Sequence, residues 1–261
     1  MIAVFSFWPM VQAFITSFTT GTGVNQKMAD PIFYNYTRMF ADRTFLRSVG
    51  NTFLYLAIEV PVMLVLAILL AQLLNNRDLK CRGLFRTMVF LPCATSLVSY
   101  ALIFKSLFAL DGLINTIFVN LGILETNYNF LGNTGSARAI IIIALIWRWT
   151  GYNMVFYLAG LQNIEYSVYE AAKIDGANGW KTFWKITVPY ISPMLIASLV
   201  YTIVDSFVDP SNEVMTLVLN QSKQWEHGYS AAMAWAYFAI IGVILAIVLA
   251  IINKFVYYEV D

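Results

Sequence analysis

The sequence predicts an all-α membrane protein with six transmembrane helices, and three observations support this fold class. Only 12% of the 261 residues are charged and 59% are apolar, whereas a soluble domain usually contains about 25% charged residues. Six apolar runs are separated by polar stretches, and each run is close to or above the roughly 20 helical residues that cross a bilayer core. The runs are continuously apolar and much longer than barrel strands, so they indicate helices.

The predicted spans follow these runs in order and together form one transmembrane domain over residues 1–261. The first run, Met1–Phe18, starts with no basic residues ahead of it, so we expect a basic cytoplasmic tail and part of the first span to be missing. The other five predicted spans are Val49–Leu74, Thr87–Phe108, Ala139–Leu161, Tyr190–Val208 and Ser230–Asn253. Pro61 and Pro92 predict kinks in the second and third spans, because proline removes a helical hydrogen bond.

Basic residues predict the orientation, because cytoplasmic loops are enriched in lysine and arginine. The loops after the second and fourth spans are basic: they carry Arg77, Lys80, Arg82 and Arg86, and Lys173, Lys181 and Lys185, respectively. Lys254 follows the sixth span. Both termini are therefore expected in the cytoplasm. The loop Gly21–Arg47 disagrees, since it carries four basic residues although this topology places it outside.

Several classes of function are excluded by composition and by missing motifs. A net charge of +1 argues against nucleic acid as a partner, and the chain contains a single histidine. Cys81 and Cys93 have neither metal-ligand spacing nor the pattern of a disulfide framework. The phosphate-binding pattern Gly-x-x-x-x-Gly-Lys-Ser/Thr is absent, so the chain does not hydrolyse ATP by that mechanism. We therefore expect a protein that is not an enzyme and holds no cofactor of its own.

The loop between the fourth and fifth spans, Ile164–Pro189, is amphiphilic. Ser167 and Glu170 fit a capping box, which predicts a short helix over 168–173 that breaks at Gly176. A second helix is expected from Trp180, ending before Pro189, because the residue before a proline disfavours the α conformation. One interpretation is a helix resting on lipid headgroups through its aromatic residues. The alternative is docking on a partner, since the small residues of this loop permit close approach.

The order of residues in this loop resembles the EAA loop of permease subunits in binding-protein-dependent ABC importers. The chain has Glu170-Ala-Ala, then Asp175-Gly-Ala, then aromatic residues, Ile186 and Pro189. Leu91-Pro92, early in the third span, also resembles that family. The stretches 9–18 and 43–52 resemble its carbohydrate-uptake, maltose- or oligosaccharide-type branch. One segment departs from it: Asp205–Glu213 replaces a segment that is usually rich in Phe and contains Gly-Gly-Pro.

The resemblance implies a cytoplasmic coupling helix between the fourth and fifth spans. Glu170 would be the acidic anchor in a groove of the ATPase, and Ala171, Ala172 and Gly176 would form a close-packed bend. Asp175 and the stretch 183–189 would fix the loop against the spans. The implied ATPase-coupling residues are Glu170, Ala171, Ala172, Asp175, Gly176, Ala177, Ile186 and Pro189.

The resemblance also implies partners and a location. These are a second homologous permease subunit, two ATP-binding subunits that carry ATP and Mg²⁺, an extracytoplasmic solute-binding protein, and a sugar or oligosaccharide. The chain would be a multi-pass protein of the bacterial or archaeal cytoplasmic (inner) membrane. It would form the translocation pathway together with the second permease.

Ionisable residues within the spans are candidates for function, because charge at membrane depth is costly. Arg148 lies in the middle of the fourth span, and Asp205 lies near the outer end of the fifth. They either pair to hold two helices together or line a polar cavity that accepts a sugar. The candidate pathway residues are Trp147, Arg148, Trp149, Tyr152, Asn153, Tyr157, Asp205, Trp235 and Tyr237. Taken one at a time, the aromatic members fit the lipid-facing or interfacial belt better than the cavity.

Two other classes of function stay open at this point. A secondary transporter driven by an ion gradient would use Glu59, Arg148 and Asp205 as relay groups. It would leave the 170–189 loop without a role, and no inverted repeat of broken helices is visible. A structural membrane protein is the third possibility, and the charges inside the spans argue against it. Co-purification with an ATPase favours the first class, and transport by the chain alone favours the second.

Overall fold

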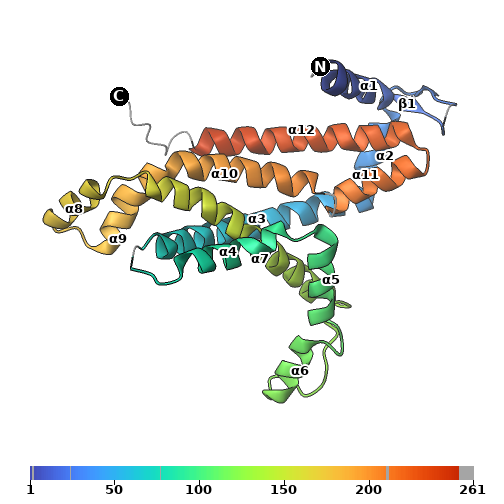
Figure 1. Cartoon of the computed structure of the whole chain (residues 1–261). Helices are drawn as coiled ribbons and strands as arrows, with labels where there is room; N and C mark the ends of the chain where they lie inside the picture. Colours follow the sequence, from blue (N-terminus) through green and yellow to red (C-terminus); the bar gives the residue numbers. More distant parts are fainter. Residues whose placement is uncertain (2, 24, 77, 210–211, 253–261) are drawn as a thin grey trace. The chain divides into compact units, whose positions relative to one another are not determined.

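The computed structural model describes residues 1, 3–23, 25–76, 78–209 and 212–252, and most of them are helical (Figure 1). The elements are the π-helix η1 (Ala3–Phe7), α1 (Trp8–Thr16), β1 (Thr19–Thr20), β2 (Lys27–Met28), α2 (Tyr34–Ala41), α3 (Arg43–Asn75), α4 (Arg82–Ala94), α5 (Leu97–Leu107), α6 (Leu113–Asn120), α7 (Thr134–Gln162), α8 (Tyr166–Ile174), α9 (Gly179–Thr182), the π-helix η2 (Phe183–Thr187), α10 (Val188–Val208), α11 (Glu213–Lys223) and α12 (His227–Ile252). The described chain forms two compact units. Unit 1 comprises residues 1–56 and 200–252, and unit 2 comprises residues 57–199.

Four helical stretches among the described residues are long and apolar enough to cross a membrane. They are α3, α7, the stretch from α9 to α11, and α12, and the bent pair α4–α5 is a fifth candidate. The N-terminal apolar helix covers only Val4–Thr16, which is shorter than the roughly 20 residues of a full span. The count of six spans and the single transmembrane domain therefore stay predictions. Lys254 and the end of the predicted sixth span at Asn253 lie outside the described residues.

The third predicted span is broken into two helices rather than kinked at Pro92. α4 ends at Ala94 and α5 follows after a break, with the two axes bent by 100°. The break lies after Pro92, because Ser96 adopts an extended conformation and caps α5 by accepting a hydrogen bond from the Ser99 N–H. A serine N-cap satisfies a helix donor that would otherwise have no partner. Pro61, in contrast, lies inside α3, which continues through it.

Three loops contain structure that the sequence analysis did not predict. The predicted outer loop 21–47 contains β2 and α2, and β2 pairs antiparallel with β1 just before the loop, with Thr19 opposite Met28. The loop between the third and fourth predicted spans contains α6, and the loop between the fifth and sixth predicted spans contains α11. Asn115 stabilises the α6 segment: its side chain donates to the carbonyls of Ala109 and Tyr128, both at 3.0 Å, and accepts from the Tyr128 N–H at 2.8 Å.

The core of unit 2 supports α8, whose Val168 and Tyr169 pack against it. The buried apolar residues come from α3, α7, the α7–α8 turn and α10: Ala67, Ala71, Leu74, Met154, Tyr157, Leu158, Leu161, Ile164 and Ile191. Small residues let the helices approach closely, as is common between membrane helices. At Gly151 on α7 a Cβ atom would lie 2.0 Å from the backbone carbonyl oxygen of Val89 on α4. This crossing therefore requires glycine.

In unit 1, polar contacts join the N-terminal hairpin and α2 to the start of α12. The buried Asn35 amide donates to the carbonyls of Ser17 and Thr19 at 2.8 and 2.7 Å. Gly228 lies so close to Thr19 that a Cβ atom would be 1.9 Å from the Thr19 carbonyl oxygen. Together these contacts fix the hairpin against the first turn of α12.

Asp42, between α2 and α3, ties the two elements to α12. Its Oδ1 accepts from the Thr44 N–H at 2.8 Å, which makes it the N-cap of α3, and its Oδ2 accepts from the Tyr229 hydroxyl at 2.9 Å. Burial acts to raise the pKa of Asp42, but hydrogen bonds from Tyr229, Thr44 and Phe45 lower it, and the net pKa lies below the usual value.

Replacing Asp42 with alanine should lower the free energy of unfolding by about 1 kcal/mol at pH 7, the usual effect of losing an N-cap. Because the folded-state pKa is depressed, this stabilisation is present above the unfolded pKa of about 3.9 and is lost as the pH falls through the folded pKa. Thermal unfolding in detergent should therefore separate Asp42→Ala from the wild type at pH 7, and the difference should shrink as the pH is lowered below about 4. Equal melting temperatures at pH 7 would contradict this account of Asp42.

Candidate functional site

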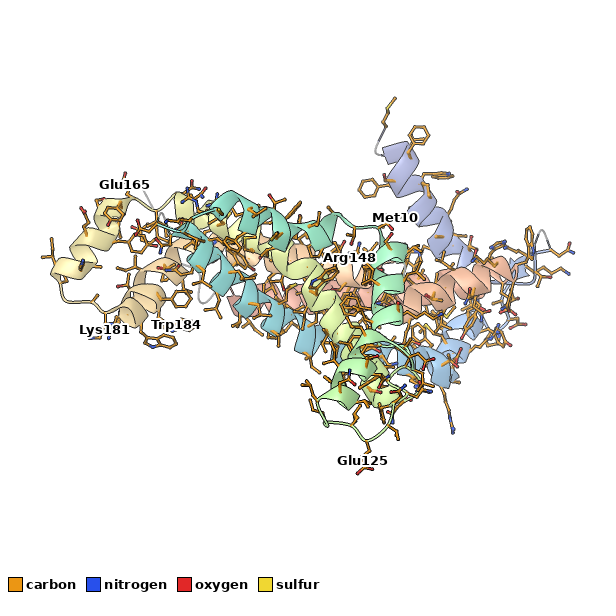
Figure 2. The ribbon with its side chains drawn as sticks, turned by 60° about the horizontal axis from the view of Figure 1, so that its bottom comes forward. Met10, Glu125, Arg148, Glu165, Lys181 and Trp184 are labelled. Atoms are coloured by element: carbon orange, nitrogen blue, oxygen red, sulfur yellow. The ribbon has the colours of Figure 1, made fainter. Side chains whose placement is uncertain are left out.

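The segment from α8 to η2 forms a helix–turn–helix at one end of unit 2, where Figure 2 shows Glu165, Lys181 and Trp184. α8 begins at Tyr166, so the predicted start at Val168 was too late. The predicted capping box was also wrong. The N-cap is Glu165, which has the extended backbone that a cap requires, while Ser167 lies inside the helix and its hydroxyl donates to the Glu165 carboxylate at 3.1 Å.

The end of α8 confirms the predicted break at Gly176. The Ala177 N–H bonds to the Ala172 carbonyl at 2.9 Å, and the Gly176 N–H bonds to the Lys173 carbonyl at 3.2 Å. This pair of bonds is the Schellman motif, which needs a left-handed residue after the helix. Gly176 supplies it with φ of +73°, a conformation that costs other residues about 1–2 kcal/mol.

Contrary to the prediction, the second helix does not end before Pro189. Asn178 caps α9 by accepting from the Lys181 N–H at 2.9 Å, and the chain then stays helical through η2 into α10. In the wider π turn the Val188 N–H bonds to the Phe183 carbonyl. Pro189 consequently lies at the junction of the π turn and α10, inside a continuous helical stretch, and not after the end of a helix.

The predicted coupling residues divide into an exposed set and a covered set. Glu170, Ala171, Asp175 and Gly176 are exposed, Ala172 is buried, and Ala177, Ile186 and Pro189 are partly buried. Ala172 is therefore not available to a partner, and its small side chain instead lets α8 lie close to its own unit. Val168 and Tyr169 pack against the core of unit 2. The Tyr169 hydroxyl lies 3.2 Å from the Thr187 hydroxyl, which joins α8 to η2.

Large apolar side chains on this end of unit 2 were in part missed by the sequence analysis. Ile174 is 85% exposed and Trp180 is 71% exposed, and Tyr166 and Trp184 are exposed as well. Exposed apolar residues are ordinary on a lipid-facing span, but these lie among Lys173, Asp175, Lys181 and Lys185. The sequence did contain a sign that Ile174 is exposed, because it lies between Lys173 and Asp175 at the end of a short predicted helix. We call the exposed residues Tyr166, Glu170 and Ile174 of α8, Trp180 of α9 and Trp184 of η2 together the knuckle.

The predicted pathway residues of unit 2 lie on α7. The Arg148 guanidinium carbon lies 4.7 Å from the centre of the Tyr100 ring and 4.9 Å from that of Trp149, distances at which a cation is attracted to an aromatic face. The Trp149 ring meets the Tyr152 ring edge-on. Trp147 is more exposed and packs against Phe104. Arg148 thus lies within an aromatic cluster in the middle of unit 2 (Figure 2).

Asn153 and Tyr157, also predicted to line the pathway, are fully buried. The Asn153 amide donates to the Trp149 carbonyl at 3.2 Å and to the Met63 sulfur at 3.5 Å. The Tyr157 hydroxyl is hydrogen-bonded to the hydroxyl of Ser198. Both side chains therefore contribute to the packing between helices of unit 2.

The remaining pathway candidates belong to unit 1. Trp235 packs edge-on against Phe14 at 5.0 Å, and the buried Tyr237 lies 5.3 Å from Phe207, measured between ring centres. Asp205 is partly buried on α10. Because Arg148 belongs to unit 2 and Asp205 to unit 1, their predicted pairing stays a prediction.

The segment that departs from the family pattern has a structural role in unit 1 that the sequence did not reveal. The Asn51 amide on α3 donates to the Glu213 carboxylate at 2.7 Å, and the Asn212 amide donates to the Thr52 hydroxyl at 3.3 Å. Asn212 is also the N-cap of α11, accepting from the Val214 N–H at 2.9 Å. These polar contacts join the start of α11 to α3.

An apolar helical chain that carries a rigid amphiphilic helix–turn–helix between two spans has the features of a membrane transport subunit. Residues 39–259 match the family of binding-protein-dependent transport system inner membrane components, and the chain belongs to this family. It is a permease subunit of an ABC importer in the inner membrane, a transport component rather than an enzyme. The predicted family is thereby confirmed.

Relatives and solved structures agree with this membership. The chain is 40% identical to the lactose transport system permease protein LacF of Rhizobium radiobacter over 84% of this chain and 77% of that protein. It is 30% identical to the multiple sugar-binding transport system permease protein MsmF of Streptococcus mutans over 97% and 91% of the two chains. Its fold is similar to a chain of a bacterial ABC transporter that imports the acidic polysaccharide alginate, with a TM-score of 0.82 at 21% identity, covering 97% of this chain and 91% of that one.

Proposed function

We propose that this permease imports a sugar or oligosaccharide and that the knuckle docks on an ATP-binding subunit. The observation that carries the docking proposal is the exposure of Glu170 and Ile174 on a helix that is fixed to its own unit by Ala172 and Tyr169. The exposed Trp180 and Trp184 of the knuckle are of the residue type that is enriched at the centre of protein–protein contacts.

The geometry supports a mechanical role for this contact. α9, η2 and α10 form one helical stretch from Gly179 to Val208, so a displacement of the knuckle is transmitted along the helix axis into a span. The hydrogen bond between Tyr169 and Thr187 makes α8 move together with that stretch. ATP would close the two ATPase subunits and shift their grooves, and the chain would respond because the groove contacts differ between the two states.

The proposed substrate and partners follow from the relatives. LacF and MsmF are named for lactose and for multiple sugars, which supports a sugar as the solute. A solved structure of the alginate transporter contains its periplasmic binding protein with a bound pentasaccharide, which supports an extracytoplasmic solute-binding partner here. A second permease and two ATP-binding subunits complete the proposed complex. Arg148 and the aromatic cluster around it would line the pathway.

The proposed orientation places the knuckle and both termini in the cytoplasm. The loop after α3 and the start of α4 carry Arg77, Lys80, Arg82 and Arg86, and the segment from α8 to η2 carries Lys173, Lys181 and Lys185. Basic loops favour the cytoplasmic side. α3 then begins outside the membrane at Arg43 and ends inside at Asn75, and α12 begins outside at His227.

The test of this function is uptake of radiolabelled lactose into proteoliposomes that contain the complete importer and its solute-binding protein. Uptake is expected to require hydrolysable ATP and the solute-binding protein and to persist when ionophores collapse the ion gradients. Uptake by this chain alone, driven by an imposed ion gradient, would instead establish the secondary-transporter alternative. An arabinooligosaccharide serves as the second probe, because another relative is named for that substrate.

A further inference from the structure

A cavity of about 190 Å³ lies in unit 1, and none of its lining residues is used in the proposed coupling or pathway. Its walls come from β1 and the following turn, from α2 and from the start of α12. The lining residues are Thr19, Thr20, Gly21, Thr22, Tyr34, Asn35, Arg38, Glu226, Gly228 and Tyr229. Threonine and tyrosine hydroxyls, one amide, one guanidinium and one carboxylate therefore surround a space of roughly six water volumes.

The charges of this cavity balance each other. Arg38 and Glu226 form an ion pair with 2.8 Å between Nη1 and Oε2, and their side chains remain 40% and 32% exposed. The Arg38 guanidinium also lies 4.0 Å from the centre of the Tyr229 ring. A free anion would compete with Glu226 for binding to Arg38, and a cation would compete with Arg38 for binding to Glu226. A neutral ligand with several hydroxyl groups can instead bond to both partners without separating them.

The cavity is preorganised. The buried Asn35 bonds to two carbonyls of the hairpin, Gly228 permits the close approach of Thr19, and Asp42 holds the Tyr229 hydroxyl. A ligand that enters such a site does not have to order its walls, which lowers the entropic cost of binding.

Trp225, next to the cavity residue Glu226, has a positive φ angle, which is unusual for a residue other than glycine. It has φ of +64° at the end of α11, where its N–H bonds to Ser222 and the Glu226 N–H bonds to Gln221. This is a Schellman ending, in which glycine would be free of strain. The indole is nevertheless 63% exposed, and the Trp225 carbonyl accepts from the Gly23 N–H at 3.2 Å. A strained aromatic residue that is exposed beside a cavity points to a function for its ring.

We propose that this cavity binds one ring of the transported sugar at the extracytoplasmic mouth of the importer. The Arg38–Glu226 pair and the threonine hydroxyls take the sugar hydroxyl groups, and the Trp225 and Tyr34 rings cover its apolar C–H face. The volume is below the usual 300–1,000 Å³ of sites for drug-sized ligands, which limits the occupant to a single ring. The proposal rests on the sugar-import function proposed above.

Equilibrium dialysis of radiolabelled lactose against the nucleotide-free importer, without its solute-binding protein, tests this site. Thr22→Phe puts a bulky ring in place of one of the threonine side chains that line the cavity, and Thr37→Phe is the matched control on the exposed side of α2. Trp225→Gly removes the indole while relieving the backbone. Lactose affinity is expected to fall about tenfold in Trp225→Gly, the usual scale of one aromatic stacking contact, to be lost in Thr22→Phe, and to be unchanged in Thr37→Phe.

Unchanged lactose affinity in both cavity variants, or an absence of saturable binding to the wild type, would overturn the proposal. Lactose and arabinooligosaccharide uptake by the same wild-type preparation separates this failure from a failure of the proposed function. If uptake occurs but the cavity variants bind lactose normally, the sugar site is elsewhere and the import function stands. If the wild type imports neither probe, the import function itself is wrong. Thermal unfolding of each variant, with Trp225→Gly at least as stable as the wild type, confirms that losses of binding do not come from misfolding.

Discussion

Gly151→Ala is expected to destabilise unit 2 strongly and to lower the amount of chain recovered from membranes. The added Cβ would lie 2.0 Å from the Val89 carbonyl oxygen and 2.9 Å from the Phe90 Cα, and both of these atoms belong to the α4 backbone. Backbone atoms cannot rotate away as a flexible side chain can, so the α4–α7 crossing must open. Overpacking of this kind costs about 1–3 kcal/mol or more, which thermal unfolding of the purified chain in detergent should detect.

The matched control is Gly83→Ala on α4, where the added Cβ would meet no atom within 4 Å beyond the backbone of its own helix turn. Because alanine is favoured over glycine in a helix by about 1 kcal/mol, this control should leave the melting temperature unchanged or raise it. A Gly151→Ala chain as stable as Gly83→Ala would show that α4 and α7 do not cross as described.

Glu170→Lys is expected to reduce ATP-driven sugar uptake to near background while leaving the chain folded and inserted. Glu170 is exposed on α8 and is not part of the core of its own unit, and lysine is as good a helix former as glutamate. The expected loss of uptake would therefore come from a weakened contact with the ATPase and not from misfolding. Reversing a charge at the centre of an interface weakens binding by about 30-fold or more. Uptake of radiolabelled lactose into proteoliposomes measures the effect.

Glu125→Lys is the charge-matched control, because Glu125 is exposed in the α6 loop, well away from α8 in unit 2 (Figure 2). Its uptake should match that of the wild type. A Glu170→Lys importer with normal uptake would mean that the acidic side chain does not anchor the loop.

The helical fold and the place of the knuckle were accessible from the sequence, because both depend on local patterns. Long apolar runs predict spans, and Gly176 predicts the end of a helix, because glycine readily adopts the left-handed backbone conformation found there. The bend between α4 and α5 could not be predicted from the sequence. Pro92 predicted a kink at its own position, but the break occurs where Ser96 caps the start of α5. The continuation of the helix through Pro189 depended on a π turn, which no single residue type predicts.

The roles of individual side chains were harder to predict, because they depend on which face of a helix is covered. Ala172 was expected to meet a partner, and it is buried in its own unit. Ile174 was not singled out, and it is the most exposed apolar residue of the knuckle. Tyr157 and Asn153 lie on a span with the composition of a sugar-binding wall, but both are buried between helices. The cavity around Arg38 joins segments far apart in the sequence, which no local pattern reveals.

The most direct test of the central claim is co-purification of the ATP-binding subunit with the tagged chain from membranes. Wild type and Glu125→Lys should each retain the ATPase, whereas Glu170→Lys and Ile174→Asp should lose it although they are inserted in equal amounts. Equal recovery of the ATPase with all four chains would contradict docking through the knuckle.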